Sequence, residues 1–239
     1  MNLAVDYGNS RIKIGLFEGN NLTTTHSFAE ENKFFEWAKN HQIDNVIVSS
    51  VTSDSLEILT NIQCRGHRLA MHQSLLFPIT IHYKTPLTLG VDRIAAACGA
   101  LEMFPQKDCL VIDMGSCINY EFIDAQANYF GGAISPGVAM RFKAMHTFTA
   151  RLPLIQPKKD PALMGQSTEE SMLSGVMNGM AAEVNGTIEK YRQKYPTLEV
   201  ILCGGDAHFF ENQLKQPIFV APNLVLCGLN RILVHNVSL

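Results

Sequence analysis

A short motif near the start of the chain combines residue types that could bind phosphate. Asp6-x-Gly8 follows an apolar run, and Lys13 lies five residues beyond the glycine. Glycine at the bend of a hairpin lets backbone N–H groups approach an anion, and lysine adds positive charge. The aspartate could hold hydrated Mg²⁺, which bridges phosphate oxygens. The pattern favours a phosphate-binding hairpin, although by itself it is also typical of an ordinary β-turn beside an exposed lysine.

A second candidate site, Gly90-Val91-Asp92-Arg93, stands where a loop becomes a predicted helix. Asp92 could simply cap the amino terminus of that helix. Alternatively, it could accept a proton from a substrate hydroxyl that attacks a phosphate, while Arg93 binds an anionic group of the substrate or nucleotide. The spacing alone is compatible with both hypotheses.

The Asp-x-Gly pattern recurs at Asp113-x-Gly115-Ser116, again directly after an apolar run. Ser116 could donate a hydrogen bond to a phosphate, and Asp113 could bind a cation. Two such loops facing one nucleotide across an interdomain cleft are the layout of a kinase. Glycine turns at 131–137 and 203–207 either permit close approach of a nucleotide or simply make tight turns.

The elements that must position these residues alternate between strands and helices. Periodicity and turn residues predict strands over 2–6, 12–16, 22–28, 45–49 and 67–70, and helices over 34–38, 56–62 and from 91 to 104, with a loop over 78–86. After residue 108 they predict strands over 109–112, 118–122, 128–134 and 199–202, and helices over 138–149, 167–195 and 224–235. The repetition predicts an α/β protein of two related domains, 1–106 and 107–239, with a short hinge near 104–108.

Composition narrows the class of protein. The 239 residues are 46% hydrophobic and carry a formal net charge of −3, so we expect an ordinary globular protein and no nucleic-acid partner. The amino terminus lacks the features of a secretory signal, and no apolar window is long enough for a membrane span, so we expect no membrane partner. The six cysteines form no Cys-x-x-Cys pair and are expected to be free thiols in a reducing cytoplasm. The histidines form no metal-ligand spacing.

Taken in order, the motifs resemble those of type III pantothenate kinases over nearly the whole chain. They are Asp6-x-Gly8-Asn9-Ser10-x-x-Lys13, Tyr83, Gly90-x-Asp92-Arg93, Asp113-x-Gly115-Ser116, the glycine turn ending at Gly137, Thr168, and Cys203-Gly204-Gly205-Asp206. That family belongs to the acetate and sugar kinase, heat-shock protein 70 and actin superfamily. The resemblance implies an α/β fold of two ribonuclease-H-like (actin-like ATPase) domains with a nucleotide cleft between them. It also implies ATP-dependent phosphorylation of pantothenate to 4′-phosphopantothenate, the first step of coenzyme A biosynthesis.

The resemblance also implies roles for single residues. Asp92 would be the proton acceptor, Ser116 would contact ATP, and Asp113 would bind a monovalent cation, K⁺ or NH₄⁺. The phosphates of Mg²⁺-ATP would be held by Asp6, Tyr7, Gly8, Asn9, Ser10, Arg11, Ile12 and Lys13. The pantothenate pocket would be lined by Tyr83, Gly90, Val91, Asp92 and Arg93, and Thr168 would reach it from the partner subunit of a homodimer. Cys117, Asn119 and Glu121 stand where the family usually has Ala, Thr and Asp.

Two alternatives to this function stay open at the level of sequence. The chain could be a non-catalytic relative, like the transcriptional accessory factors that share this family's sequence, or a kinase of another small acid or sugar. Retention of Lys13, Asp92, Arg93 and Asp113 favours an enzyme, because a binding scaffold has no need for a base in a cleft.

Overall fold

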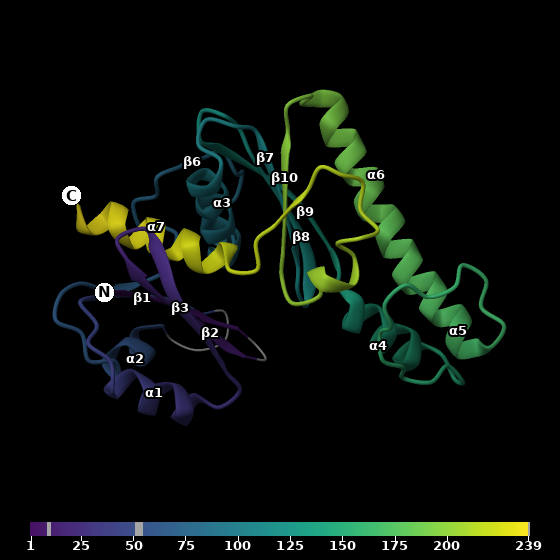
Figure 1. The fold of residues 1–239 in the computed structure, drawn as a ribbon, viewed down its shortest axis with the longest axis horizontal. Helices are drawn as coiled ribbons and strands as arrows, with labels where there is room; N and C mark the ends of the chain where they lie inside the picture. The colour runs from purple at the N-terminus through teal and green to yellow at the C-terminus, as the bar shows by residue number, and fades with distance from the viewer. Residues whose placement is uncertain (9–10, 51–54, 239) are drawn as a thin grey trace. The chain divides into compact units, whose positions relative to one another are not determined.

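Two units of mixed α/β structure make up the described part of the chain, residues 1–8, 11–50 and 55–238 of this computed structural model. Unit 1 comprises residues 1–106, 123–130 and 223–239, and unit 2 comprises 107–122 and 131–222. Figure 1 shows the course of the chain through the elements of each unit. The α/β class predicted from the alternating pattern is confirmed, as is each of the main strands and helices.

The sheet of unit 1 has five strands in the order β3-β2-β1-β4-β5. These are β1 (Asn2–Tyr7), β2 (Ile12–Glu18), β3 (Asn21–Phe28), β4 (Asn45–Ser50) and β5 (Arg68–Ala70). The first two strands form the predicted antiparallel hairpin, and β4 runs parallel to β1. Alternate residues of β1, Leu3 and Val5, enter the hydrophobic core of the unit, so Ala4 and Asp6 face the opposite side of the sheet.

Helices cover both faces of this sheet. Buried side chains of α1 (Glu31–Lys39) and α2 (Ser55–Thr60) join the core on one face. On the other face, α7 (Leu224–Val237) contacts β1, β2 and β4 and packs against α3 (Val91–Met103). The last helix of the chain therefore returns to the first sheet (Figure 1).

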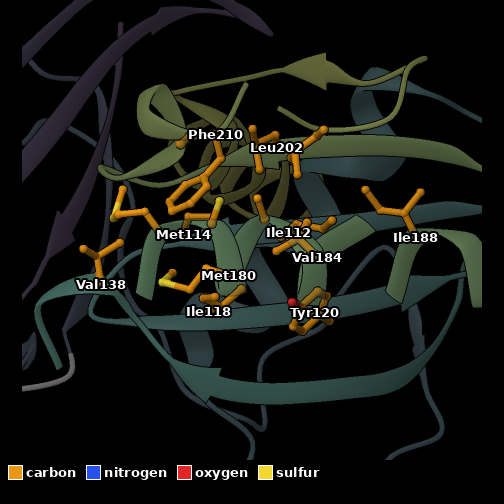
Figure 2. Packing of buried hydrophobic residues seen from close by; sticks show 14 of the residues in the cluster. Ile112, Met114, Ile118, Tyr120, Val138, Met180, Val184, Ile188, Leu202 and Phe210 are labelled. Carbon is orange, nitrogen blue, oxygen red and sulfur yellow. The ribbon is translucent and has the colours of Figure 1, made fainter. Parts of the chain in front are cut away.

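Unit 2 is built on β7 (Cys109–Met114), β8 (Cys117–Ile123), β9 (Asn128–Pro136), β10 (Glu199–Cys203) and β11 (Phe219–Val220), in the order β11-β10-β7-β8-β9. The predicted loop over 78–86 differs in detail from the structure, because Thr80–Ile81 forms a two-residue strand, β6, beside the start of β9, and Pro86–Thr88 forms a 3₁₀ turn. Figure 2 shows the core of unit 2, in which Ile112 and Met114 of β7 and Tyr120 of β8 meet Met180 and Val184.

The helices of unit 2 are α4 (Val138–Phe148), α5 (Thr168–Leu173) and α6 (Gly179–Lys194). A π-helical turn, Ser174–Asn178, joins α5 to α6, so the predicted helix over 167–195 is confirmed as one continuous helical run. Ser167 caps it, because its side chain accepts a hydrogen bond from the Glu170 N–H at 3.2 Å. Within the described ranges, no helix combines the length and apolarity that crossing a membrane requires.

Candidate active site

Three polar residues of unit 1 lie in one row across neighbouring strands. Lys13 of β2 is the register partner of Asp6 in β1, and Asp6 is in turn the register partner of Ser49 in β4. Register partners project from the same face of a sheet. The row lies at the carboxyl ends of the parallel strands β1 and β4, which is where open α/β sheets bind ligands.

The turn that follows Asp6 is closed by a hydrogen bond from the Gly8 N–H to the Arg11 carbonyl, 3.1 Å long. The Arg11 side chain turns to β3, where its Nε donates to the Ser27 hydroxyl at 2.7 Å. Ile12 is buried in the core and Tyr7 packs against it, so these two residues support the turn from the core side. Asn9 and Ser10, predicted to bind ATP phosphates, lie outside the described residues.

Ser49 is a member of this row that the sequence analysis missed. Its side chain is 1% exposed, and its hydroxyl has no hydrogen-bond partner among the described residues. An unsatisfied buried hydroxyl is costly and rare in native proteins. The only sequence signal was a polar residue at the end of an otherwise apolar strand, Val46 to Val48.

Asp92 lies in the first turn of α3, and the N-cap position of that helix is Gly90. The capping interpretation of Asp92 is therefore wrong, since the aspartate is the second helical residue. A Cβ atom at Gly90 would come within 2.5 Å of the Asp92 Oδ1 atom. A larger residue at position 90 would therefore make the Asp92 carboxylate shift.

Arg93 and Tyr83, which the sequence analysis assigned to one pocket, lie together in unit 1. The Arg93 guanidinium carbon lies 5.7 Å from the centroid of the Tyr83 ring, a cation–π distance. Arg93 is buried, with 7% of its surface exposed. The centroid of the Tyr83 ring in turn lies 6.4 Å from that of the fully buried Tyr129 ring. Two aromatic rings are therefore packed in series beside the guanidinium.

In unit 2, the second Asp-x-Gly motif begins within β7, which extends to Met114 and so runs two residues past the predicted strand. Asp113 alternates with the core residues Ile112 and Met114, so it projects from the face of the sheet opposite that core. By the same alternation Asn119 and Glu121 of β8 share that opposite face. These oxygen-bearing side chains are suited to a hard cation. The described residues hold no cluster of three or more His, Cys, Asp or Glu side chains that could bind a metal.

Two glycine-containing segments pack directly against the loop that Asp113 begins. The Gly137 N–H donates to the Ser116 carbonyl at 3.2 Å, and a Cβ at Gly137 would lie 2.3 Å from the Gly115 carbonyl oxygen. Gly204 has a φ of +91°, and a Cβ there would lie 2.5 Å from the Asp113 Oδ1 atom. At 203–207 these contacts support a tight turn, whereas residues 131–136 belong to β9 and form no turn. In both segments glycine lets backbone approach backbone.

Asp206 follows the second of these turns, and its N–H donates to the Met114 carbonyl at 2.9 Å. Burial raises the pKa of the Asp206 carboxyl, and nearby His208 partly opposes that rise. The carboxyl group therefore lies in a poorly solvated place beside the Asp113 loop.

Thr168 belongs to unit 2. It is the first residue of α5 and is exposed. It lines a cavity of about 680 Å³ on unit 2 together with Met145, Leu152 and Met172.

The class of protein is that of the actin-like ATPase fold, and each unit has an Asp-x-Gly motif at the end of its first strand. A solved structure from Campylobacter jejuni, described as a Baf family transcriptional activator, shares this fold with a TM-score of 0.67 and 23% identity, covering 99% of this chain and all of that one. The activator of 2-hydroxyisocaproyl-CoA dehydratase from Clostridium difficile, with bound ADPNP, shares it with a TM-score of 0.56 and 10% identity, covering 99% of this chain and 94% of that one.

The chain belongs to the type III pantothenate kinase family. The family model matches residues 2–190. A type III pantothenate kinase from Cytophaga hutchinsonii is 45% identical over 241 residues, covering 99% of this chain and 100% of that protein. The resemblance drawn from the ordered motifs is confirmed.

Proposed function

We propose a mechanism, residue by residue, for the reaction of this family. The chain is an enzyme that transfers a phosphoryl group from ATP to pantothenate, giving 4′-phosphopantothenate in the first step of coenzyme A biosynthesis. The observation that carries the mechanism is the placement of Asp92 in the first turn of α3, against Gly90 and beside the buried, ring-backed Arg93.

In this mechanism Asp92 accepts the proton of the pantothenate hydroxyl as the oxygen attacks the γ-phosphate of ATP. General base catalysis of this kind needs a carboxylate within hydrogen-bond reach of the hydroxyl. Arg93, with its charge desolvated and its plane backed by Tyr83, binds the pantothenate carboxylate. Gly90 and Val91 complete the pocket through their backbone, since Val91 itself is buried.

The row formed by Lys13 and Asp6 holds the phosphates of ATP and its metal ion. Mg²⁺ binds through one or two carboxylates and keeps several waters, so a single aspartate beside a lysine is a suitable protein contribution. When bound, the ion neutralises charge that develops on the phosphate oxygens. The turn of residues 7–12, with Asn9 and Ser10 included in this proposal, also contacts the phosphates, through groups other than the Gly8 N–H that donates to the Arg11 carbonyl.

In unit 2, Ser116 contacts ATP and Asp113 binds a monovalent cation, K⁺ or NH₄⁺. The exposed position of Ser116 and the shared face of Asp113, Asn119 and Glu121 support these roles. Because Glu121 is one methylene longer than the aspartate usual in the family, the relative activation by K⁺ and NH₄⁺ is a property to measure.

The active protein is a homodimer in this proposal, with Thr168 of one subunit reaching the pantothenate pocket of the other. Large apolar side chains that are exposed on unit 2 support it. They include Ile134, Met140, Phe148, Leu154, Leu163 and Met164, of which Phe148 and Leu163 are each 85% exposed. They come from β9, α4 and the segment between α4 and α5, and large exposed apolar patches mark interaction sites.

We further propose that the enzyme works in the cytoplasm without nucleic-acid or membrane partners, which the net charge of −3 supports. The sequence halves 1–106 and 107–239 are proposed to be the two copies of a duplicated domain. Their recurring Asp-x-Gly loops support that division, while α7 of the second half packs within unit 1.

The decisive experiment compares the wild-type enzyme with Asp92→Asn in an assay that couples ADP release to pantothenate, with K⁺ and NH₄⁺ each present. We expect kcat to fall by about 10²–10⁴-fold, because general acid–base catalysis contributes that much, while ATP binding measured by calorimetry is retained. Glu31→Gln is the matched control, since Glu31 is the acidic residue in the first turn of α1, and it should keep full activity. A wild type that is inactive with both cations would contradict the mechanism. So would an Asp92→Asn enzyme that keeps more than about a tenth of the wild-type activity.

A further inference from the structure

Arg141 of α4 makes an unusual set of contacts at the start of its own helix. Its Nε donates to the Pro136 carbonyl at 2.8 Å, and its Nη2 donates to the Ser135 hydroxyl at 3.0 Å. The same Nη2 forms an ion pair with the Glu183 carboxylate of α6 at 2.6 Å. Both charged side chains are partly buried, at 22% and 33% exposure. One guanidinium therefore ties the end of β9 to α6.

The peptide group between Pro136 and Gly137 is held from both ends. Its carbonyl accepts from Arg141, and its N–H donates to the Ser116 carbonyl at 3.2 Å. Peptide groups are planar, so the carbonyl and the N–H cannot be reoriented independently. Arg141 thus sets the direction from which the Gly137 N–H meets the Asp113–Ser116 loop.

The close packing of this turn makes the loop sensitive to that direction. The Gly137 α-carbon lies so near the loop that a Cβ would come within 2.6 Å of the Ser116 carbonyl oxygen. At the start of the loop, Gly204 approaches Met114 and Asp113 equally closely. Backbone therefore packs against both ends of the loop, and a rotated Pro136–Gly137 peptide would displace Ser116 and Gly115.

We propose that Arg141, held in place by Glu183, is a positioning residue for the Asp113–Ser116 loop and so for binding of ATP and the monovalent cation. The proposal rests on the role given above to that loop. Arg141 itself touches neither the nucleotide nor pantothenate in this scheme. Its effect passes through the Pro136–Gly137 peptide to the backbone of Ser116.

The chemistry of the side chain explains why arginine is needed. The planar guanidinium donates hydrogen bonds to Pro136, Ser135 and Glu183 at the same time. The ammonium group of lysine is instead a point charge on a flexible side chain. A lysine at position 141 can keep the ion pair with Glu183 but not all three contacts. A glutamine loses the charge and the ion pair.

The test compares Arg141→Gln, Arg141→Lys and a matched control, Arg192→Gln, in the full-length protein. Arg192 is a partly buried arginine of α6 that also donates to backbone carbonyls, those of Lys215, Gln216 and Pro217, away from the loop. Calorimetry measures ATP affinity with Mg²⁺ and K⁺ present, and hydrogen–deuterium exchange of residues 113–117 reports on the loop itself. Steady-state assays give KM separately for ATP and for pantothenate.

For Arg141→Gln we expect ATP affinity to fall about tenfold, the loss of roughly one charge-assisted hydrogen bond, with faster exchange in residues 113–117 and a higher K⁺ requirement. The ATP affinity of Arg141→Lys should lie between that of Arg141→Gln and that of the wild type. In both variants KM for pantothenate should change less than about twofold, well below the tenfold effect on ATP affinity. Equal ATP affinity and equal exchange in Arg141→Gln and Arg192→Gln would overturn the proposal. If the wild type binds ATP but does not phosphorylate pantothenate, the proposed function fails while this inference stands on the binding and exchange data.

Discussion

Among single residues, Asp92 and Ser49 show how a side chain's neighbours decide what it can do. The Asp92 carboxylate lies so close to Gly90, the N-cap of its helix, that a larger residue there would make it shift. Ser49 has the opposite situation, since it is buried without a partner in the part of the chain that the structure describes. Both residues belong to unit 1, and Ser49 lies in register with Asp6.

Ser49 leads to a stability prediction for the unliganded protein. Ser49→Ala removes a buried hydroxyl whose hydrogen bond to water was lost on folding, so the free energy of unfolding should rise by about 1 kcal/mol. Denaturant unfolding without nucleotide measures the change. Thr23→Ala is the control, because the Thr23 hydroxyl donates to the Leu16 carbonyl at 3.0 Å and its loss should lower stability by about 0.5–1.5 kcal/mol. A destabilised Ser49→Ala protein would show that the hydroxyl has a partner in solution.

The residue types that carry charge or flexibility were recognisable from the sequence, because their chemistry is local. Asp6, Lys13, Asp92 and Asp113 stand out beside glycines and at the ends of apolar runs. Ser49 did not stand out, since a serine at the end of a strand is common and only its burial makes it unusual. Arg141 was missed for a similar reason, because its partner Glu183 is 42 residues away.

At the level of elements, the crossing of α3 and α7 is the contact that positions α3, the helix that carries Asp92. Two glycines make the crossing possible. A Cβ at Gly228 of α7 would lie 1.8 Å from the Ala95 carbonyl oxygen of α3, and a Cβ at Gly99 would lie 2.4 Å from the Leu224 carbonyl oxygen. Because backbone atoms form both contacts, a side chain at either position forces the helices apart.

Gly228→Ala should therefore lower the free energy of unfolding by about 3 kcal/mol, which is the upper part of the usual range for overpacking a core. It should also reduce kcat, because Asp92 moves with α3. Thermal or denaturant unfolding and the ADP-release assay measure the two effects. Gly186→Ala is the matched control, since Gly186 also lies inside a helix, α6, but a Cβ there would meet no atom of the described residues within 4 Å beyond its own helix. That change should raise stability by about 0.5–1 kcal/mol through helix propensity. Similar unfolding for both variants would contradict close packing at the crossing.

For the molecule as a whole, the proposed homodimer makes the clearest prediction. Phe148→Glu places a charge on the exposed apolar surface of unit 2, where Phe148 is 85% exposed. Burying a charge at an interface is costly, so we expect a dimer of the wild type to become a monomer, as measured by light scattering after size-exclusion chromatography. Activity should fall with it, because the Thr168 of a partner subunit is lost.

The control for that experiment is Leu56→Glu, which changes an apolar side chain of α2 in unit 1 that is 62% exposed. This variant should keep the oligomeric state and activity of the wild type. A wild type that is monomeric at assay concentrations, yet fully active, would contradict the proposed role of Thr168.

By itself, the sequence determined the α/β class, the hairpin from Asp6 to Lys13, the start of α3 at Gly90 and the long helical run after Ser167. These features depend on turn residues, caps and hydrophobic periodicity, which act over a few residues along the chain. Tertiary structure alone decided that α7 packs on α3, that Ser49 joins the row of Asp6, and that Arg141 directs the peptide beside Ser116. Each of these depends on segments that are distant in the sequence and meet only when the sheets and helices pack, which no local pattern encodes.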